Sequence, residues 1–162
     1  MTCRCPYWVT ERIGGCSLIC PEDIESLEEA GVSAIVGLVE EDEYYECWDE
    51  GVEGLLEALY SRGIEFYYIP TPDFAAPDVE EACRVFRRVE EVEKRGGRIV
   101  FHCYAGLGRT GTMIAAYLVA VYGMGLEKAL EAVKKACPYA GPQSYAQEFF
   151  LEVVASQANS MC

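Results

Sequence analysis

The stretch from Val100 to Gly111 constrains the fold more than any other part of this sequence. It begins as an apolar run, continues as a short loop with two glycines, and opens into a long apolar helix. At a strand–loop–helix joint of this kind the first amides of the helix surround the loop, so an anion can bind there. The joint therefore predicts a buried strand that delivers an anion-binding loop to the edge of a sheet.

The loop combines a nucleophile with a cradle for a tetrahedral anion. Cys103 begins it and Arg109 ends it, with five residues between them. Gly106 and Gly108 allow the backbone to turn so that several N–H groups point inward. We expect Cys103 to be a thiolate, because a helix N-terminus and a nearby cation favour the ionised thiol. Arg109 supplies a planar fork for two oxygens of one phosphate. This combination indicates transfer of a phosphoryl group to sulfur.

Strands and helices alternate along the rest of the chain. Strands are expected at residues 7–9, 17–19, 34–39, 64–69 and 98–102, with a glycine turn at 14–15 between the first two. Helices are expected at residues 21–31, 52–62, 78–95, 110–122, 126–137 and from 143 onward. This alternation predicts an α/β fold, a single domain over residues 1–162 with a central, mostly parallel sheet flanked by helices. Phosphate then binds at the carboxyl ends of the strands, where the loop lies.

The length and charge of the chain limit its partners. With 162 residues it can bury a full core without a metal. The net charge of −14 argues against nucleic acid and anionic membranes as partners. The longest apolar run, residues 113–121, is far shorter than the ~20 residues that span a bilayer. The N-terminus also lacks the pattern of a signal peptide. We therefore expect a cytoplasmic protein, without a membrane partner and monomeric by default.

Nine cysteines are many for a cytoplasmic chain. Zinc is disfavoured, because Cys-x-x-Cys spacing is absent and His102 is the only histidine. The cysteines could form disulfides, which occur inside the cells of hyperthermophiles, or remain buried free thiols. The sequence does not decide between these alternatives, and it does not identify which cysteines would pair. The cysteines besides Cys103 are Cys3, Cys5, Cys16, Cys20, Cys47, Cys83, Cys137 and Cys162.

Residues 40–50 form an acidic segment, in which seven of eleven residues are Asp or Glu. A run of this composition predicts a solvated loop. Its position after a central strand leaves a second interpretation open, in which the segment lies at the rim of the cleft and its aromatic residues contact substrate.

The motif His102-Cys103-x5-Arg109-Thr110 resembles the signature of the cysteine-dependent protein phosphatases. The short chain is similar to the dual-specificity branch, especially its small archaeal members, and the run from Ala105 to Gly111 is similar to the Cdc14-type loop. The similar region covers about residues 7–155, followed by a polar, frayed tail from about 156. The resemblance implies hydrolysis of phosphotyrosine and, more slowly, phosphoserine or phosphothreonine in proteins or peptides.

The resemblance also implies a cysteinyl-phosphate intermediate and neither metal nor cofactor. It assigns substrate binding to the loop residues together with Arg109 and Gln143. These loop residues are Tyr104, Ala105, Gly106, Leu107 and Gly108.

The oxygen that leaves phosphorus needs a proton, so the site needs a carboxylic acid on a nearby loop. Asp73 is the expected general acid, because it follows a strand, lies between prolines and precedes Cys103 by a spacing similar to that of the family's acid. The ionised Asp73 then serves as general base toward water. Asp78 is the rival, although a helix N-cap role explains it without catalysis.

Four residues besides these are expected to complete the site. Gln143 and Gln147 lie four apart at the start of the last helix, in a pattern similar to the family's water-positioning segment, and Gln147 fits that role better. Two exposed glutamines with no role are the alternative. Thr110 is expected to donate its hydroxyl to the Cys103 sulfur, and His102 to orient the loop backbone.

Three other functions remain to be weighed. A phosphoprotein-binding module without turnover is disfavoured by the intact Cys103, Arg109 and Asp73. Phosphoinositide or nucleotide phosphatases are a second alternative, but lipid-directed relatives carry extra lysines in the loop, where this chain has Tyr104 and Leu107. Sulfur transferases of the rhodanese type also use a loop cysteine, but their loop lacks the Gly-Arg-Thr ending.

Overall fold

The computed structural model describes residues 3–162, apart from the side chains of residues 158–161. Five strands form one sheet in the order β1-β2-β5-β3-β4, and only β1 runs antiparallel to its neighbour. The strands are β1 (Tyr7–Trp8), β2 (Ile13–Cys16), β3 (Val32–Gly37), β4 (Glu65–Tyr68) and β5 (Arg98–His102). The predicted α/β fold with a mostly parallel sheet is therefore confirmed.

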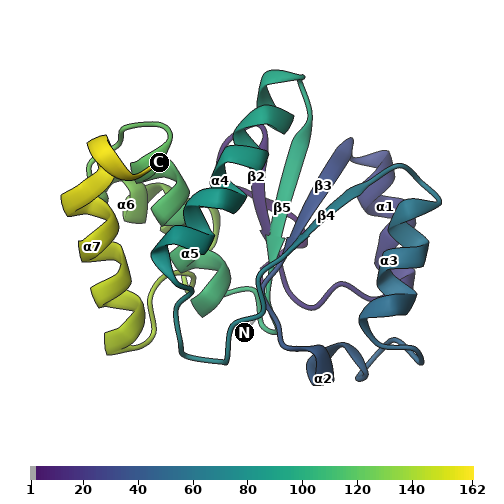
Figure 1. The fold of residues 1–162 in the computed structure, drawn as a ribbon. Helices are drawn as coiled ribbons and strands as arrows, with labels where there is room; N and C mark the ends of the chain where they lie inside the picture. Colours follow the sequence, from purple (N-terminus) through teal and green to yellow (C-terminus); the bar gives the residue numbers. More distant parts are fainter. Residues whose placement is uncertain (1–2) are drawn as a thin grey trace.

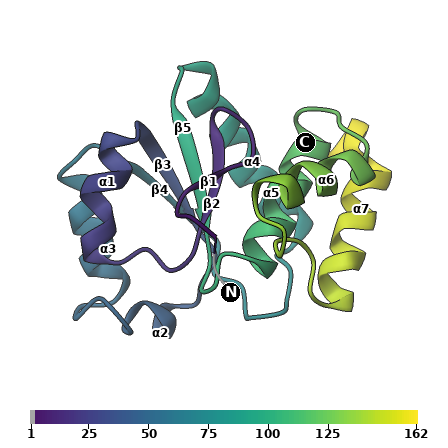
Figure 2. The ribbon, with the colours of Figure 1, turned by 180° about the vertical axis from the view of Figure 1, so that it is seen from behind.

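Helices cover both faces of this sheet. Figures 1 and 2 show α1 and α3 on one side and α4 to α7 on the other, with α5 between the sheet and the pair α6 and α7. The helical segments are η1 (Pro21–Asp23), α1 (Ile24–Glu29), α2 (Glu41–Tyr44), α3 (Val52–Tyr60), α4 (Val79–Lys94), α5 (Gly108–Ala120), α6 (Leu126–Ala136) and α7 (Tyr145–Met161). Because both faces are covered, the central strands are continuous apolar runs.

The strand β5 lies at the centre of the hydrophobic core. Ile99, Val100 and Phe101 are fully buried between the two helical layers. Each such side chain contributes about 1.5–3 kcal/mol relative to an exposed one. The helix that follows, α5, is buried along nearly its whole length, as its largely apolar sequence predicts. The loop between β5 and α5 thus has rigid elements on both sides.

The chain changes direction at the carboxyl ends of β3 and β5. After β3 it continues through α2 to α3 on one face, whereas after β5 it enters α5 on the opposite face. The two strands are neighbours, and Leu38 N–H donates to His102 O (3.0 Å) just beyond their ends. A crevice at such a switch point is the usual ligand site of an open α/β sheet. The fold therefore places the cysteine-containing loop at this point.

The expected turn at Gly14 and Gly15 is wrong. Both glycines belong to β2, and the residues expected as the second strand, 17–19, are not a strand. A Cβ on Gly14 would lie 2.8 Å from the Trp8 ring, and one on Gly15 would collide with the Tyr7 ring. The glycines are therefore explained by the aromatic side chains of β1 that pack on β2.

All eight cysteines other than Cys103 form disulfides. The sequence left this choice open, and the structure resolves it. Closing the longest loop, between residues 134 apart in sequence, contributes about 4–5 kcal/mol on the chain-entropy model. The pairs are Cys3–Cys137, Cys5–Cys16, Cys20–Cys47 and Cys83–Cys162.

The C-terminal tail differs from the expectation. The backbone of α7 remains helical to Met161, so the frayed tail expected from residue 156 is wrong. The disulfide of Cys162 with Cys83 on α4 fixes the end of this helix. No helix in the described part of the chain is both long and apolar enough to span a membrane.

Charge is distributed unevenly over the two sides of the sheet. Residues 13–61, which include α1, α2 and α3, contain 14 of the 27 carboxylates and none of the 13 lysines and arginines. The rest of the chain therefore carries as many basic as acidic residues. The whole net charge of −14 lies on the part of the protein that contains α2.

Candidate active site

Residues 103–107 connect β5 to α5 and rest against the segment after β2. Leu18 N–H donates to Tyr104 O (2.9 Å), and Cys103 N–H donates to Cys16 O (3.4 Å). Cys103 is 2% exposed and is the free cysteine of the described chain. The nucleophile predicted from the sequence therefore lies at the base of a loop that is anchored on β2.

The loop directs its carbonyl groups outward. Four of them accept hydrogen bonds from outside the loop: Cys103 O from His102 Nδ1 (3.1 Å), Tyr104 O from Leu18 N (2.9 Å), Gly106 O from the Tyr7 hydroxyl (2.6 Å) and Leu107 O from Gly141 N (3.1 Å). In a trans peptide the C=O and the following N–H point in opposite directions, so each bond turns the next amide toward the inner side of the loop. Within the described chain, no N–H of residues 104–109 donates to a backbone carbonyl. These amides form an anion-binding nest.

Two glycines of the loop have no room for a side chain. Gly106 has φ +78°, in the left-handed region, and a Cβ there would lie 2.7 Å from the carbonyl carbon of Cys16. A Cβ on Gly108 would lie 2.6 Å from Gln143 Oε1. The glycines thus permit both the turn and the close approach of neighbouring segments.

Arg109 is held rigidly below the loop. It is 3% exposed, and its Nη1 and Nη2 donate to the two carboxylate oxygens of Glu43, at 2.9 Å each. Nη1 also donates to Thr71 O (2.8 Å). Of the five guanidinium hydrogens, the Nε–H and the adjacent Nη2–H remain, and Nε has no partner among the described residues. These two hydrogens form a side-on fork that suits two phosphate oxygens.

Glu43 was missed by the sequence interpretation. The acidic segment was predicted as a solvated loop, but its first part forms α2, with Glu43 against Arg109 and Tyr44 fully buried. The alternative of a segment at the cleft rim is nearer to the structure. Burial opposes ionisation of Glu43, but hydrogen bonds from Arg109 and the backbone outweigh it and lower the pKa of the carboxyl. The sequence feature that could have indicated this role of Glu43 is the acidic run directly after a central strand.

His102 is buried and neutral. Burial, aided by the charge of Arg109, lowers its pKa to about 4. Its Nδ1 faces Cys103 O, which can only accept, so Nδ1 carries the proton and Nε2 accepts from the Tyr44 hydroxyl (2.6 Å). His102 thus bonds the loop backbone as the sequence predicted, and α2 contacts both ends of the motif.

Asp73 lies at the mouth of the site. Its Oδ1 is 3.7 Å from Arg109 Nη2, and its side chain is 63% exposed. The same oxygen accepts the N–H of Phe74, which has φ +67°, and Ser144 Oγ donates to Phe74 O (2.5 Å). The rival Asp78 caps α4 by accepting Glu81 N–H, as expected. The geometry places Asp73, rather than Asp78, beside the arginine.

The two glutamines have different environments. Gln147 is 1% exposed and lies over Gly108, whereas Gln143 is exposed. Gln147 Nε2 donates to Ala75 O (3.1 Å), and its Oε1 accepts Gln143 N–H (2.7 Å). The amide of Gln147 therefore connects α7 to the loop of Asp73, and the alternative of two exposed glutamines is wrong for Gln147. Its water-positioning role remains a prediction. Ser144, rather than Gln143, caps the last helix.

Four more predicted residues border the site. The Thr110 hydroxyl is buried and makes no hydrogen bond within the described residues, so the expected bond to the Cys103 sulfur is not formed here. Tyr104 is 47% exposed, and a hydrogen bond to Glu46 raises the pKa of its hydroxyl. Ala105 is exposed in the loop, and Leu107 is half-buried at the start of α5.

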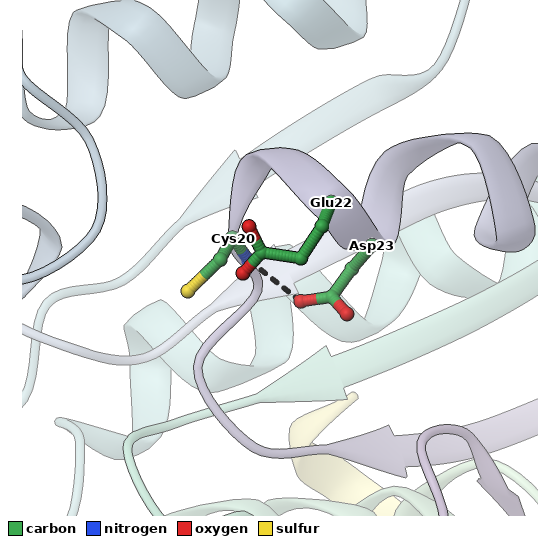
Figure 3. Close-up of side chains that lie close together, drawn as sticks. All are labelled: Cys20, Glu22 and Asp23. Atoms are coloured by element: carbon green, nitrogen blue, oxygen red, sulfur yellow. Dashed lines mark hydrogen bonds between the residues drawn. The ribbon is translucent and has the colours of Figure 1, made fainter.

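A cluster that resembles a metal site lies elsewhere. Cys20, Glu22 and Asp23 bring their ligand atoms together at η1, as Figure 3 shows. The Cys20 sulfur is bonded to Cys47, so it offers no thiolate, and Asp23 accepts the N–H of Cys20 (2.8 Å). This group caps the helix. Around Cys103, the described residues contain only one histidine and the carboxylates already assigned, which do not form a metal-ligand set.

Comparisons with known proteins agree with this geometry. A family model described as "Polymorphic toxin system, DSP-PTPase phosphatase" matches residues 13–123, more than half of the chain. The protein tyrosine phosphatase domain-containing protein 1 of Bos taurus is 30% identical over 71% of this chain, and the tyrosine-protein phosphatase CDC14 of Saccharomyces cerevisiae is 34% identical over 51%. In both cases the match covers 15% of the relative's own length.

A solved structure matches over nearly the whole chain. The structure of Tk-PTP in its active form superposes with a TM-score of 0.83 at 28% identity, over 94% of this chain and 97% of the other. The chain therefore belongs to the cysteine-dependent dual-specificity phosphatases, which are phosphoric monoester hydrolases.

Proposed function

We propose that this protein hydrolyses phosphotyrosine and, more slowly, phosphoserine and phosphothreonine, through a cysteinyl-phosphate intermediate and without a metal or cofactor. The observations that support this most directly are the inward-facing amides of the loop that begins at Cys103 and the Nε edge of Arg109, which has no partner among the described residues. One phosphate in this loop receives hydrogen bonds from the amides and from the Nε side of the guanidinium. Its phosphorus then faces the sulfur.

In the first step the Cys103 thiolate attacks phosphorus, and the S–P bond forms while the P–O bond to the substrate breaks. Negative charge on the equatorial oxygens is stabilised by the loop amides and Arg109, which are fixed before substrate arrives. The departing oxygen takes a proton from Asp73, whose exposed carboxyl lies 3.7 Å from Arg109. Thr110 is buried, its hydroxyl has no partner among the described residues, and we propose that it donates to the Cys103 sulfur as this leaves in the second step.

In the second step water attacks phosphorus, and the S–P bond breaks to release phosphate. Asp73 now accepts the proton of this water. We propose that Gln147 orients the water and that Gln143 contacts the substrate from the same end of α7. The hydrogen bond from Gln147 to Ala75 supports this, because it keeps α7 close to the loop that carries Asp73.

The proposed partners are phosphorylated proteins or peptides, and neither nucleic acid nor membrane is proposed as a partner. Exposed Tyr104 and Phe74 at the mouth suit a peptide side chain, and the acidic surface around α2 favours basic residues next to it. We propose a monomeric, single phosphatase domain over residues 1–162, in which about 7–155 is the phosphatase-like part. A cytoplasmic location is proposed together with an archaeal source, since four disulfides suit the cytoplasm of a hyperthermophile.

The deciding experiment incubates the pure protein with an aryl phosphate and a panel of phosphopeptides in EDTA. Release of phosphate that disappears in Cys103→Ser supports the phosphatase. Tight binding of phosphopeptides without release would instead support a binding module. Release only from phosphoinositides or nucleotides would reject the protein substrates, and absence of release from every phosphoserine and phosphothreonine peptide would reject dual specificity.

A further inference from the structure

The N-terminal segment, residues 3–8, is covalently attached to two supports of the catalytic loop. Cys5 is bonded to Cys16, whose carbonyl accepts Cys103 N–H (3.4 Å) and lies against Gly106. Cys3 is bonded to Cys137, at the end of α6 and four residues before the turn that donates Gly141 N–H to the loop. One disulfide thus joins the segment to a residue that contacts the loop directly, and the other joins it to a residue four positions before such a contact.

Two residues after Cys5, Tyr7 reaches into the loop. It is 5% exposed, and its hydroxyl donates to Gly106 O at 2.6 Å across 99 residues of sequence. Its ring occupies the space above Gly15, where any Cβ would collide with it. Burial, and then the charge of Cys103, raise the pKa of the Tyr7 hydroxyl, so it keeps its proton and acts as donor at every working pH.

This hydrogen bond determines the orientation of one peptide of the cradle. The C=O of Gly106 and the N–H of Leu107 belong to the same trans peptide and point in opposite directions. Because Tyr7 holds the carbonyl on the outer side, the Leu107 N–H points to the inner side, as do the other free amides. Gly106 has φ +78° and no side chain, so its peptide would turn over more easily than its neighbours without a partner.

We propose that Tyr7 is a positioning residue for the catalytic loop, and that the two N-terminal disulfides hold it in place. The segment 3–8 then acts as a brace that keeps the Leu107 amide directed at a bound tetrahedral oxyanion. The proposal rests on the proposed function, because the oxyanion is the phosphate of the substrate or product. Breaking the brace weakens phosphate binding although Cys103, Arg109 and Asp73 are unchanged.

Inorganic phosphate is the probe, and its affinity is measured by calorimetry in the Cys103→Ser protein, which cannot turn over. Tyr7→Phe keeps the ring on Gly15 and removes only the hydroxyl. Loss of one buried hydrogen bond predicts weaker phosphate binding by about 3–10-fold. With Cys103 intact, kcat/KM for an aryl phosphate falls at least as much. Tyr117→Phe is the matched control, since its buried hydroxyl donates to Glu93 instead and its loss leaves phosphate affinity unchanged.

The disulfides provide a second, independent test. The pair of changes Cys5→Ser and Cys16→Ser weakens phosphate binding in the same direction, and adding Tyr7→Phe produces less than the product of the two effects, because both act through Gly106. Removing Cys83–Cys162, which joins α4 to the end of α7, lowers thermal stability but leaves phosphate affinity unchanged.

The possible failures are distinguishable. If the Cys103→Ser protein with all other residues intact binds no phosphate, the proposed function itself is wrong. If it binds phosphate and Tyr7→Phe binds equally well while folded, the positioning role is wrong. If the effects of Tyr7→Phe and of the disulfide changes on phosphate affinity multiply fully, the two act separately, and the proposal that the disulfides hold Tyr7 in place is wrong.

Discussion

Replacing Glu43 with glutamine tests whether Glu43 orients Arg109, because the change leaves the charge of Arg109 itself intact. The carboxylate makes two hydrogen bonds of 2.9 Å to a guanidinium whose side chain is 2% exposed, and Glu43 itself is only 21% exposed. Glutamine keeps one acceptor oxygen, so one charge-assisted bond, worth about 1.5–3 kcal/mol, is lost. Thr71 O still accepts from Nη1, which favours the lower half of that range.

If this loss is expressed in the transition state, kcat/KM falls by about 10–50-fold, since 1.36 kcal/mol corresponds to a factor of ten. The assay is the steady-state hydrolysis of an aryl phosphate, with phosphate affinity measured in the Cys103→Ser protein. Glu41→Gln is the matched control, because Glu41 is exposed on the same helix. Equal kcat/KM in the two variants would refute the reasoning, because Arg109 would then keep its orientation without Glu43.

Stability against acid provides an independent measure of the same pair. The folded pKa of Glu43 lies below its ordinary value of 4.5, chiefly through Arg109 acting against burial. The pair therefore stabilises the fold above about pH 4.5, and this contribution is lost as the pH falls through the folded pKa. Urea unfolding between pH 7 and pH 3 is expected to show a smaller acid-induced loss in Glu43→Gln than in Glu41→Gln.

Other predictions concern the chemistry of the loop and its substrates. Asp73→Asn should slow thiophosphate formation from phosphotyrosine by about 10²–10⁴-fold but from an activated aryl phosphate much less, as seen in pre-steady-state bursts; an equal effect on both esters, or this pattern in Asp78→Asn, would reject Asp73 as the acid. Cys103→Ser should abolish turnover but leave phosphopeptide binding. Arg109→Lys should nearly abolish both turnover and phosphopeptide binding, because a point charge cannot replace the planar fork of the guanidinium. Gly106→Ala should lower kcat/KM at least tenfold, since its Cβ would lie 2.7 Å from the backbone of the neighbouring segment; wild-type activity would show that the loop relaxes freely. Phosphopeptides with flanking lysine or arginine should have higher kcat/KM than acidic ones, with a difference that shrinks between 0.05 and about 0.5 M salt; a salt-independent ratio would exclude an electrostatic origin.

Much of the catalytic loop could be predicted because its determinants are close together in the sequence. Cys103, the two glycines and Arg109 lie within seven consecutive residues, and the backbone turn that they need is a local property. The N-cap of α4 at Asp78 could be predicted for the same reason. Asp73 was predicted as the general acid from its loop between prolines, whereas its distance from Arg109 depends on the fold.

The partners of the loop could not be predicted in this way. Glu43 reaches Arg109 across 66 residues, Tyr44 reaches His102 across 58, and Tyr7 reaches Gly106 across 99. An acidic run in the sequence is typical of a solvated loop, and only the neighbouring positions of β3 and β5 bring α2 to the arginine. The paired glycines of β2 were misinterpreted for a similar reason, because their role is to accommodate rings from another strand.

The sequence by itself determined the alternation of strands and helices, the nucleophile loop and therefore the class of chemistry. These follow from periodicity, glycine conformation and spacing, which depend on residues near one another in the chain. Only the tertiary structure decided the strand order, the pairing of eight cysteines and the groups that orient the arginine, the histidine and the Gly106 peptide. These hydrogen bonds and disulfides form between atoms that the packed chain brings within a few ångströms. A local sequence pattern does not indicate which distant segments will be brought together in this way.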